Sequence, residues 1–275
     1  MNRDIVFGQY YPGASFVHKL DPRTKLLAAV VFIVAIFLCQ HYIAYATCYA
    51  FLLFVILVSR IPVLSILKTV RAIIFIVVFT AILNVFFYKE GTSLWSWWRI
   101  DITVGGLVYA SKMILRIVFL AVGTSLVSFT TTPMALTDGM ESLMKPLKLV
   151  RFPVHDVAVI MSTALRFIPT LMEEVNKIIL AQKARGAHFD TGGLGKRIKS
   201  LLSILIPLFV STFRRADELA MALDARCYNA TPNRTKMKPL HFSWRDGVAV
   251  FLLTVFMTAV VLLYVGFFGL LPAWL

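Results

Sequence analysis

Five stretches of the chain are almost continuously apolar, and polar or basic segments separate them. They run from Leu26 to Cys39, Tyr42 to Val58, Thr69 to Phe87, Val104 to Phe129 and Val248 to Leu271. At a rise of about 1.5 Å per residue, each run is long enough, or nearly so, to cross a hydrocarbon core about 30 Å thick. Only Gln40 and His41 separate the first two runs, which predicts a tight hairpin of two short helices. The pattern predicts an all-α membrane protein with about five transmembrane helices.

Between the fourth and fifth runs the pattern becomes amphipathic. Apolar residues recur there every three or four positions, as in Leu165, Ile168, Met172, Val175 and Ile179, which indicates helices with one apolar face. We therefore predict an N-terminal segment with four transmembrane helices over 1–129, a cytoplasmic domain of amphipathic helices over 130–245, and a last transmembrane helix over 246–275.

Composition supports membrane insertion. The 275 residues are 59% hydrophobic and 15% charged, with a net charge of +14, far from the composition of a soluble domain. Counting Lys and Arg from Thr130 to Arg245 gives 17 of the 28, so the central segment is a basic surface. Beside a membrane, such a surface favours anionic lipid or an acidic protein over nucleic acid. The three cysteines and five histidines are too scattered to predict a disulfide framework, a metal site or a catalytic dyad.

The distribution of basic residues predicts the topology. Lys and Arg precede the first run, lie between the second and third, and follow the fourth, so the N-terminus is expected in the cytoplasm. With five spans the C-terminus lies outside, and so does the loop after the third run, whose residues Trp95, Trp97 and Trp98 are typical of an interfacial aromatic belt.

Two pairs of cations lie at unfavourable positions, the first at the positive end of a helix dipole and the second at the depth of the bilayer core. Asp21-Pro22 predicts the start of the first helix, which places Arg23 and Lys25 at a membrane surface, facing either lipid headgroups or a partner protein. Lys112 and Arg116 lie four residues apart inside the fourth run. They either contact something in the bilayer, or snorkel and point at neighbouring helices.

The sequence Ala-x-x-Ala-Arg occurs twice, in "AQKARG" (181–186) and "ALDARC" (222–227). Each copy ends an amphipathic stretch, so each arginine is predicted in the last turn of a helix. Alanines one turn apart allow close approach to another surface, and an arginine fork can pair bidentately with a carboxylate. Two such ends would suit two equivalent pockets, whereas the alternative is that each arginine only complements its own helix dipole and lipid phosphate.

Four stretches together resemble a known family. "YYPGASFVHKLDPRTKL" (10–26), "ALRFIP" (164–169), "AQKARG" (181–186) and "ELAMALDARCY" (218–228) are similar to the transmembrane T component of energy-coupling factor (ECF) transporters. The resemblance implies a scaffold in the cell membrane of a prokaryote, which joins two ABC-type ATPases to a small integral-membrane subunit that binds a vitamin or another micronutrient.

The resemblance also implies the docking residues. The two motifs would end coupling helices and enter grooves on the two ATPases, through Ala184, Arg185, Gly186, Ala225, Arg226 and Cys227. Cys227 departs from the family's usual glycine, which leaves the path of the chain after the second helix open. The other stretches add Arg23, Lys25, Arg166 and Pro169 as candidate interface residues.

The chain carries no G-x-x-x-x-G-K-[ST] motif, so we expect the partner ATPases to bind ATP and Mg²⁺ and this chain to bind no cofactor. Two other classes of protein are alternatives. A self-sufficient carrier or channel would need inverted repeats or broken polar helices. An intramembrane enzyme would need clustered histidines or carboxylates at a membrane face.

Overall fold

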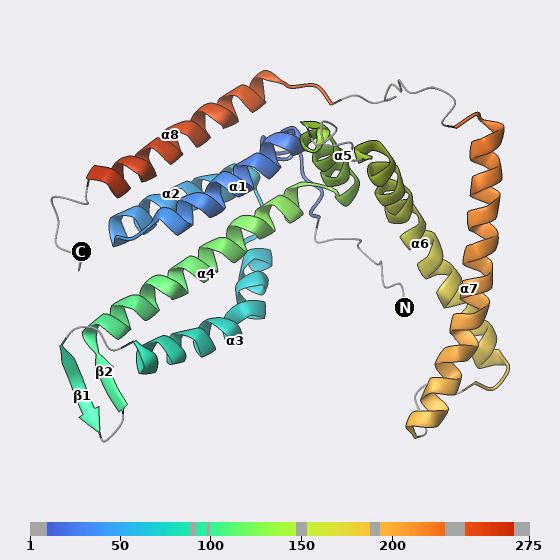
Figure 1. The fold of residues 1–275 in the computed structure, drawn as a ribbon, viewed down its shortest axis with the longest axis horizontal. Coiled ribbons are helices and arrows are strands. Elements are labelled where there is room, and N and C mark those ends of the chain that lie inside the picture. The colour runs from blue at the N-terminus through green and yellow to red at the C-terminus, as the bar shows by residue number, and fades with distance from the viewer. Residues whose placement is uncertain are drawn as a thin grey trace. The chain divides into compact units, whose positions relative to one another are not determined.

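The computed structural model describes residues 10–88, 92–97, 100–146, 153–187, 193–228 and 240–266. Its helices are α1 (Pro22–Leu38), α2 (Tyr42–Ser59), α3 (Val63–Phe87), α4 (Val104–Thr130), α5 (Pro133–Leu143), α6 (Val154–Ala184), α7 (Leu194–Ala225) and α8 (Trp244–Gly266), as Figure 1 shows. Strands β1 (Ser93–Trp97) and β2 (Ile100–Thr103) pair antiparallel. The fold is all-α apart from this hairpin, as predicted.

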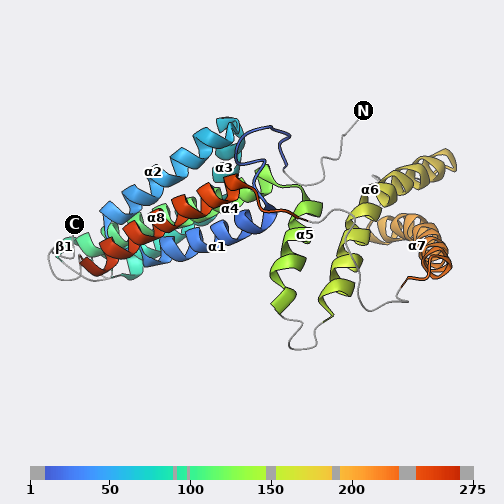
Figure 2. The same ribbon diagram turned by 90° about the horizontal axis from the view of Figure 1, so that it is seen from above.

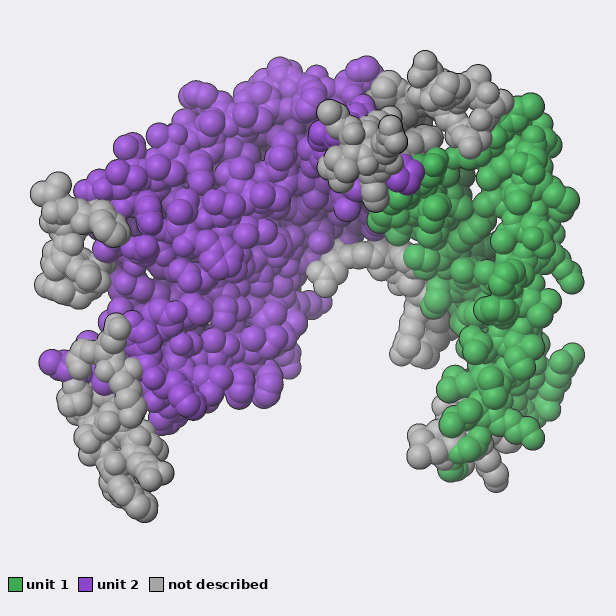
Figure 3. All heavy atoms as spheres, viewed as in Figure 1, with its two compact units in different colours: residues 1–5, 155–239 green, residues 6–154, 240–275 purple. Residues whose placement is uncertain are grey.

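The chain divides into two compact units, coloured separately in Figure 3. The membrane unit comprises residues 6–154 and 240–275, and the α6–α7 unit comprises residues 1–5 and 155–239. Within the described residues, α2, α3, α4 and α8 are long and apolar enough to cross a membrane. Helix α1, with 17 residues, lies at the lower limit of a spanning helix.

Four helices share the core of the membrane unit. In both Figure 1 and Figure 2, α1, α2, α4 and α8 run alongside one another. Their buried contacts include Phe32 and Ile36 of α1, Cys48 of α2, Phe119 of α4 and Val260 of α8. Helix α3 packs along α4, yet Val77 is the one residue of α3 that is buried. Most of its apolar surface therefore faces outward, as expected of a helix in lipid.

Helix starts follow the capping chemistry of the sequence. The Asp21 carboxylate accepts the Arg23 N–H at the start of α1, and the Thr132 hydroxyl accepts the Ala135 N–H at the start of α5. Both caps precede a proline, which needs no N–H partner in the first turn. The tight α1–α2 hairpin is confirmed, because α1 ends at Leu38 and α2 begins at Tyr42.

Two features differ from the sequence prediction. Helix α3 begins at Val63, six residues before the expected span, so Lys68 lies within a helix rather than before it. The loop after α3 forms the β1–β2 hairpin. Its alternating sequence "SLWSW" and the following "IDIT" have high strand propensity, which the interpretation as an aromatic belt overlooked.

The cations inside α4 contact their neighbours. The Arg116 guanidinium donates to the backbone carbonyl of Cys39 at 3.3 Å and lies 5.6 Å from the centroid of the Phe37 ring. Lys112 lies 5.1 Å from the centroid of the Tyr42 ring. Arg116 therefore caps the carbonyl end of α1 and complements its dipole. Of the two expectations, the structure favours cations that point at neighbouring helices.

In the α6–α7 unit, polar side chains of the two long helices contact each other. Both the Ser211 hydroxyl and the Arg215 guanidinium donate to the carboxylate of Glu174, the arginine at 3.1 Å. This contact fixes the point at which α6 and α7 meet. Each helix also continues through an internal proline, Pro169 or Pro207.

Candidate functional site at two helix ends

The first motif ends α6 in a Schellman turn. Ala184 is the last helical residue, and Gly186 adopts a left-handed conformation with φ of 84°. The Gly186 N–H donates to the Lys183 carbonyl and the Ala187 N–H to the Gln182 carbonyl, both at 3.0 Å. These are the two hydrogen bonds that define the turn. Arg185 is therefore the C-cap residue, at the point where the chain leaves the helix.

The second motif ends α7 in the same way. The Cys227 N–H donates to the Asp224 carbonyl and the Tyr228 N–H to the Leu223 carbonyl, both at 2.9 Å. Cys227 takes the left-handed position with φ of 52°. The path of the chain, which the sequence left open, thus matches that after α6, although a non-glycine residue in this conformation costs about 1 to 2 kcal/mol.

The two motifs consequently present equivalent surfaces. Arg185 and Arg226 both occupy the C-cap position and are exposed, as are Ala184 and Ala225 beside them. Among the residues that the structure describes, neither arginine side chain has a hydrogen-bond or ion-pair partner. Each guanidinium is available to a carboxylate, with a small residue next to it that permits close approach.

A continuous apolar stripe precedes the second motif. Residues spaced three and four apart along α7 are exposed, and they are Ile198, Leu201, Leu202, Leu205, Ile206, Phe209, Val210 and Phe213. A patch of this extent on a water-soluble surface marks an interaction site. The arginine of α7 therefore ends a helix whose apolar face has no cover among the described residues of its own unit.

Two of the other candidate residues also lie on α6. Arg166 and Pro169 are both exposed. Because proline has no N–H, the Leu165 carbonyl loses its ordinary helical donor at this position. Both residues are thus accessible on one helix, and their role in an interface stays a prediction.

Lys25 does not lie at a free surface, which corrects the expectation for this residue. It is 5% exposed, and its ammonium donates to the His18 carbonyl at 3.2 Å and to the Thr130 carbonyl at 2.9 Å. A buried cation needs such acceptors, and the ends of neighbouring segments supply them. Lys25 therefore links the segment before α1 to the end of α4 within the membrane unit.

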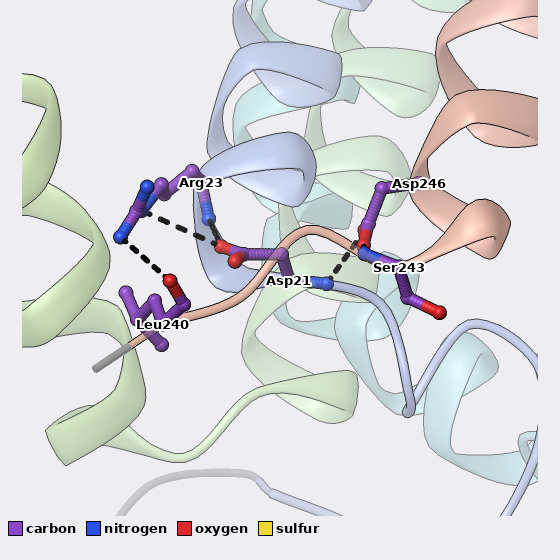
Figure 4. A network of polar contacts seen from close by, with 5 residues as sticks. All are labelled: Asp21, Arg23, Leu240, Ser243 and Asp246. Carbon is purple, nitrogen blue, oxygen red and sulfur yellow. Dashed lines mark hydrogen bonds and ion pairs between the residues drawn. The ribbon is translucent and has the colours of Figure 1, made fainter. Parts of the chain in front are cut away.

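Arg23 is also engaged within the membrane unit (Figure 4). Its guanidinium donates to the Leu240 carbonyl at 3.5 Å, its Nε lies 3.8 Å from the Asp21 carboxylate, and the Phe242 ring centroid is 5.3 Å away. The side chain is partly exposed. Arg23 thus connects the start of α1 to the segment that leads into α8.

Asp246, which the sequence analysis did not single out, completes this connection. One carboxylate oxygen accepts the Asp21 N–H and the other accepts the Ser243 N–H, each at 2.8 Å (Figure 4). With Ser243 at the N-cap and Asp246 three residues later, the second bond is half of a capping box. The Ser-x-x-Asp spacing was a signal for the cap, whereas nothing local indicated the bond to Asp21.

Comparison with known proteins identifies relatives of the whole chain. Residues 13–237 match the CbiQ family, described as cobalt transport protein. The chain is 48% identical over 268 residues to the energy-coupling factor transporter transmembrane protein EcfT of Ruminiclostridium cellulolyticum, covering 98% of this chain and 100% of the relative. Proteins of the same name from Clostridium kluyveri and Bacillus subtilis are 47% and 43% identical, and each match covers 90% of this chain and 93% of the relative.

The fold and these relatives define the class as a transmembrane component of a multisubunit bacterial transporter. The chain belongs to the CbiQ/EcfT family of energy-coupling factor transporter transmembrane proteins. The family resemblance found in the sequence is confirmed.

Proposed function

We propose that this chain is the scaffold of an ATP-driven importer, and that α6 and α7 each dock one ABC-type ATPase through its terminal arginine. The observation that carries the proposal is the equivalence of the two helix ends. Two copies of one hydrogen-bonded turn present two exposed, unpaired guanidinium groups. An arginine that only complements its own helix dipole or a lipid phosphate does not need the same backbone geometry at both helix ends. Two similar pockets on paired ATPases do need it.

The other partner in the proposal is a small integral-membrane subunit that binds the vitamin or micronutrient. The exposed apolar stripe of α7 and the outward-facing surface of α3 provide apolar area for contacts with other chains and lipid. The ATPases would bind ATP and Mg²⁺, and this chain would transmit their movement without catalysing a reaction. The relatives' names, which describe transporter membrane components, support this role over an intramembrane enzyme.

A self-sufficient carrier or channel is less well supported. Aromatic side chains fill the core between α2 and α8, where the Phe51 and Phe256 ring centroids are 4.2 Å apart. The proposal places α6 and α7 in the cytoplasm of a bacterium, where they can meet soluble ATPases. It places the N-terminus on the same side of the membrane.

The test is alanine replacement of each arginine in the complete transporter. If Arg185 or Arg226 pairs with a buried carboxylate, its removal costs about 2 to 5 kcal/mol, so affinity at that end falls about 30-fold or more. Each single variant should copurify with less ATPase and import poorly, and the double variant should lose both functions. Lysine keeps the charge but loses the bidentate fork, so it should restore assembly better than transport.

Arg214→Ala is the matched control. Arg214 is an exposed arginine of α7, about three turns before the end of that helix. Its replacement should leave ATPase copurification unchanged. All variants should first show wild-type levels of this chain in the membrane. A double alanine variant that assembles and imports normally would refute the docking role of both motifs.

A further inference from the structure

The end of α2 carries an arginine in an unusual backbone conformation. Arg60 is the C-cap residue of α2 and has φ of 55°, in the left-handed region. Its N–H donates to the carbonyls of Ile56 and Leu57, at 3.1 and 3.3 Å, and so closes the helix. Glycine would close it without the strain that any L-side chain causes there. The turn therefore does not explain the arginine, and strained residues of this kind cluster at binding and catalytic sites.

Arg60 lines a hollow of about 580 Å³ between α2 and the segment before α1. The other residues around this hollow include Ser15, Phe16, Phe54 and Leu57. Arg60 is exposed, and among the residues that the structure describes its guanidinium has no hydrogen-bond or ion-pair partner. The Ser15 hydroxyl, by contrast, lies 2.6 Å from Nδ1 of His18 and is hydrogen-bonded to it. Arg60 therefore supplies the donors that a ligand in the hollow can use.

The hollow lies at the boundary between apolar surface and charge. Helix α2 is apolar and long enough to cross a membrane, and Arg60 directly follows its last residue, Ser59. Its 18 residues span about 27 Å, close to the thickness of a hydrocarbon core of about 30 Å. Arg60 is therefore expected at the level of the lipid phosphates. Leu57 is 73% and Phe54 48% exposed, so the hollow is open to the lipid around α2.

Helix α3 adds two exposed cations close to Arg60 in the sequence. Lys68 and Arg71 are three residues apart and so share one helix face, and neither has a hydrogen-bond or ion-pair partner among the described residues. The 25 residues of α3 span about 38 Å, so its first turns can lie among the headgroups. From Tyr42 to Phe87 the sequence contains no Asp or Glu. The α2–α3 corner, defined as Arg60, Lys68 and Arg71, thus carries three positive charges that no carboxylate of these two helices compensates.

We propose that the α2–α3 corner binds an anionic phospholipid of the adjacent leaflet, whose phosphate accepts hydrogen bonds from the Arg60 guanidinium in the hollow. The arginine fork matches two phosphate oxygens, and the lipid chains continue along the exposed Phe54 and Leu57. Lys68 and Arg71 add attraction to a headgroup with net negative charge. The site is independent of whether the arginine motifs at the ends of α6 and α7 dock ATPases.

The test compares two phospholipids with identical acyl chains, anionic phosphatidylglycerol and zwitterionic phosphatidylcholine. Full-length protein, purified with its associated subunits and stripped of lipid, is incubated with an equimolar mixture, and native mass spectrometry counts the lipids of each kind that remain bound. The wild type should prefer phosphatidylglycerol. In Arg60→Gly this preference should fall about fivefold, the size expected for one cation at an anionic surface. Arg60→Lys keeps the charge but loses the fork, so it should retain part of the preference.

Glycine suits the left-handed position, so Arg60→Gly should unfold in phosphatidylcholine at a temperature no lower than the wild type does. This measurement separates a lost site from a lost fold. Arg214→Ala is the matched control, because it removes one positive charge from an exposed position on α7; it should bind lipid as the wild type does. An unchanged preference in Arg60→Gly, an equal loss in Arg214→Ala, or complete displacement of the lipid by inorganic phosphate would overturn the proposal.

Discussion

Replacing Gly186 by alanine should loosen the end of α6. The residue has φ of 84°, and a Cβ there would meet no atom within 4 Å. The cost is therefore one of backbone conformation alone, about 1 to 2 kcal/mol for an L-residue in the left-handed region. The strain falls on the turn closed by the Ala187 N–H and the Gln182 carbonyl. At 1.4 kcal/mol per factor of ten, the Ala187 amide should exchange about 5- to 30-fold faster.

Hydrogen exchange of the full-length chain in nanodiscs measures this effect. Cys227→Gly is the reciprocal variant, since it removes the left-handed strain at the end of α7, and it should slow exchange at Tyr228 a few-fold. Gly195→Ala is the control, because Gly195 is also open to a Cβ but lacks a positive φ. Alanine is favoured over glycine within a helix by roughly 0.5 to 1 kcal/mol, so this variant should not accelerate exchange.

Unchanged exchange at Ala187 in the Gly186→Ala variant would refute the reasoning. It would show that α6 does not end in a left-handed turn, and the structural equivalence of the two arginines would lose its basis. Equal acceleration in Gly195→Ala would instead indicate general destabilisation.

Three further predictions concern the membrane unit. Asp246→Asn leaves one of two backbone N–H groups without an acceptor, so the complex should lose roughly 1 to 3 kcal/mol of stability, visible as a lower midpoint of thermal unfolding in detergent. Cys39 and Cys48 have Sγ atoms 3.4 Å apart, so copper phenanthroline with oxygen should link them, whereas persistent free thiols would contradict the packing of α1 on α2. A cysteine placed at Ser93 should react with an impermeant reagent on intact cells; labelling only after lysis would reverse the predicted topology.

Much of the fold could be predicted because membrane insertion imposes a strong local signal. Continuous apolar runs located α1, α2, α4 and α8, and a capping residue followed by proline marked the start of α1. The signal fails where local composition is ambiguous. Lys68 shortened the apparent span of α3, although a helix near a membrane surface accommodates a lysine through its flexible stem.

The site was predicted from repetition, since one motif twice in a chain indicates one task performed twice. What the sequence did not reveal are contacts between distant segments. Asp21 and Asp246 are 225 residues apart, and neither the burial of Lys25 nor its carbonyl partners can be inferred from its neighbours in sequence. The left-handed conformation of Cys227 was likewise hidden, because the residue type argues against it.

The contacts of Arg116 and Lys112 have a consequence for biosynthesis. A cation at the centre of a helix entering a bilayer opposes insertion by about 2.5 to 3.5 kcal/mol. The groups that receive these cations, the Cys39 carbonyl and the rings of Phe37 and Tyr42, all belong to the α1–α2 hairpin. This hairpin leaves the ribosome before α4 does. The groups that contact Lys112 and Arg116 are therefore synthesised before the helix that carries these two cations.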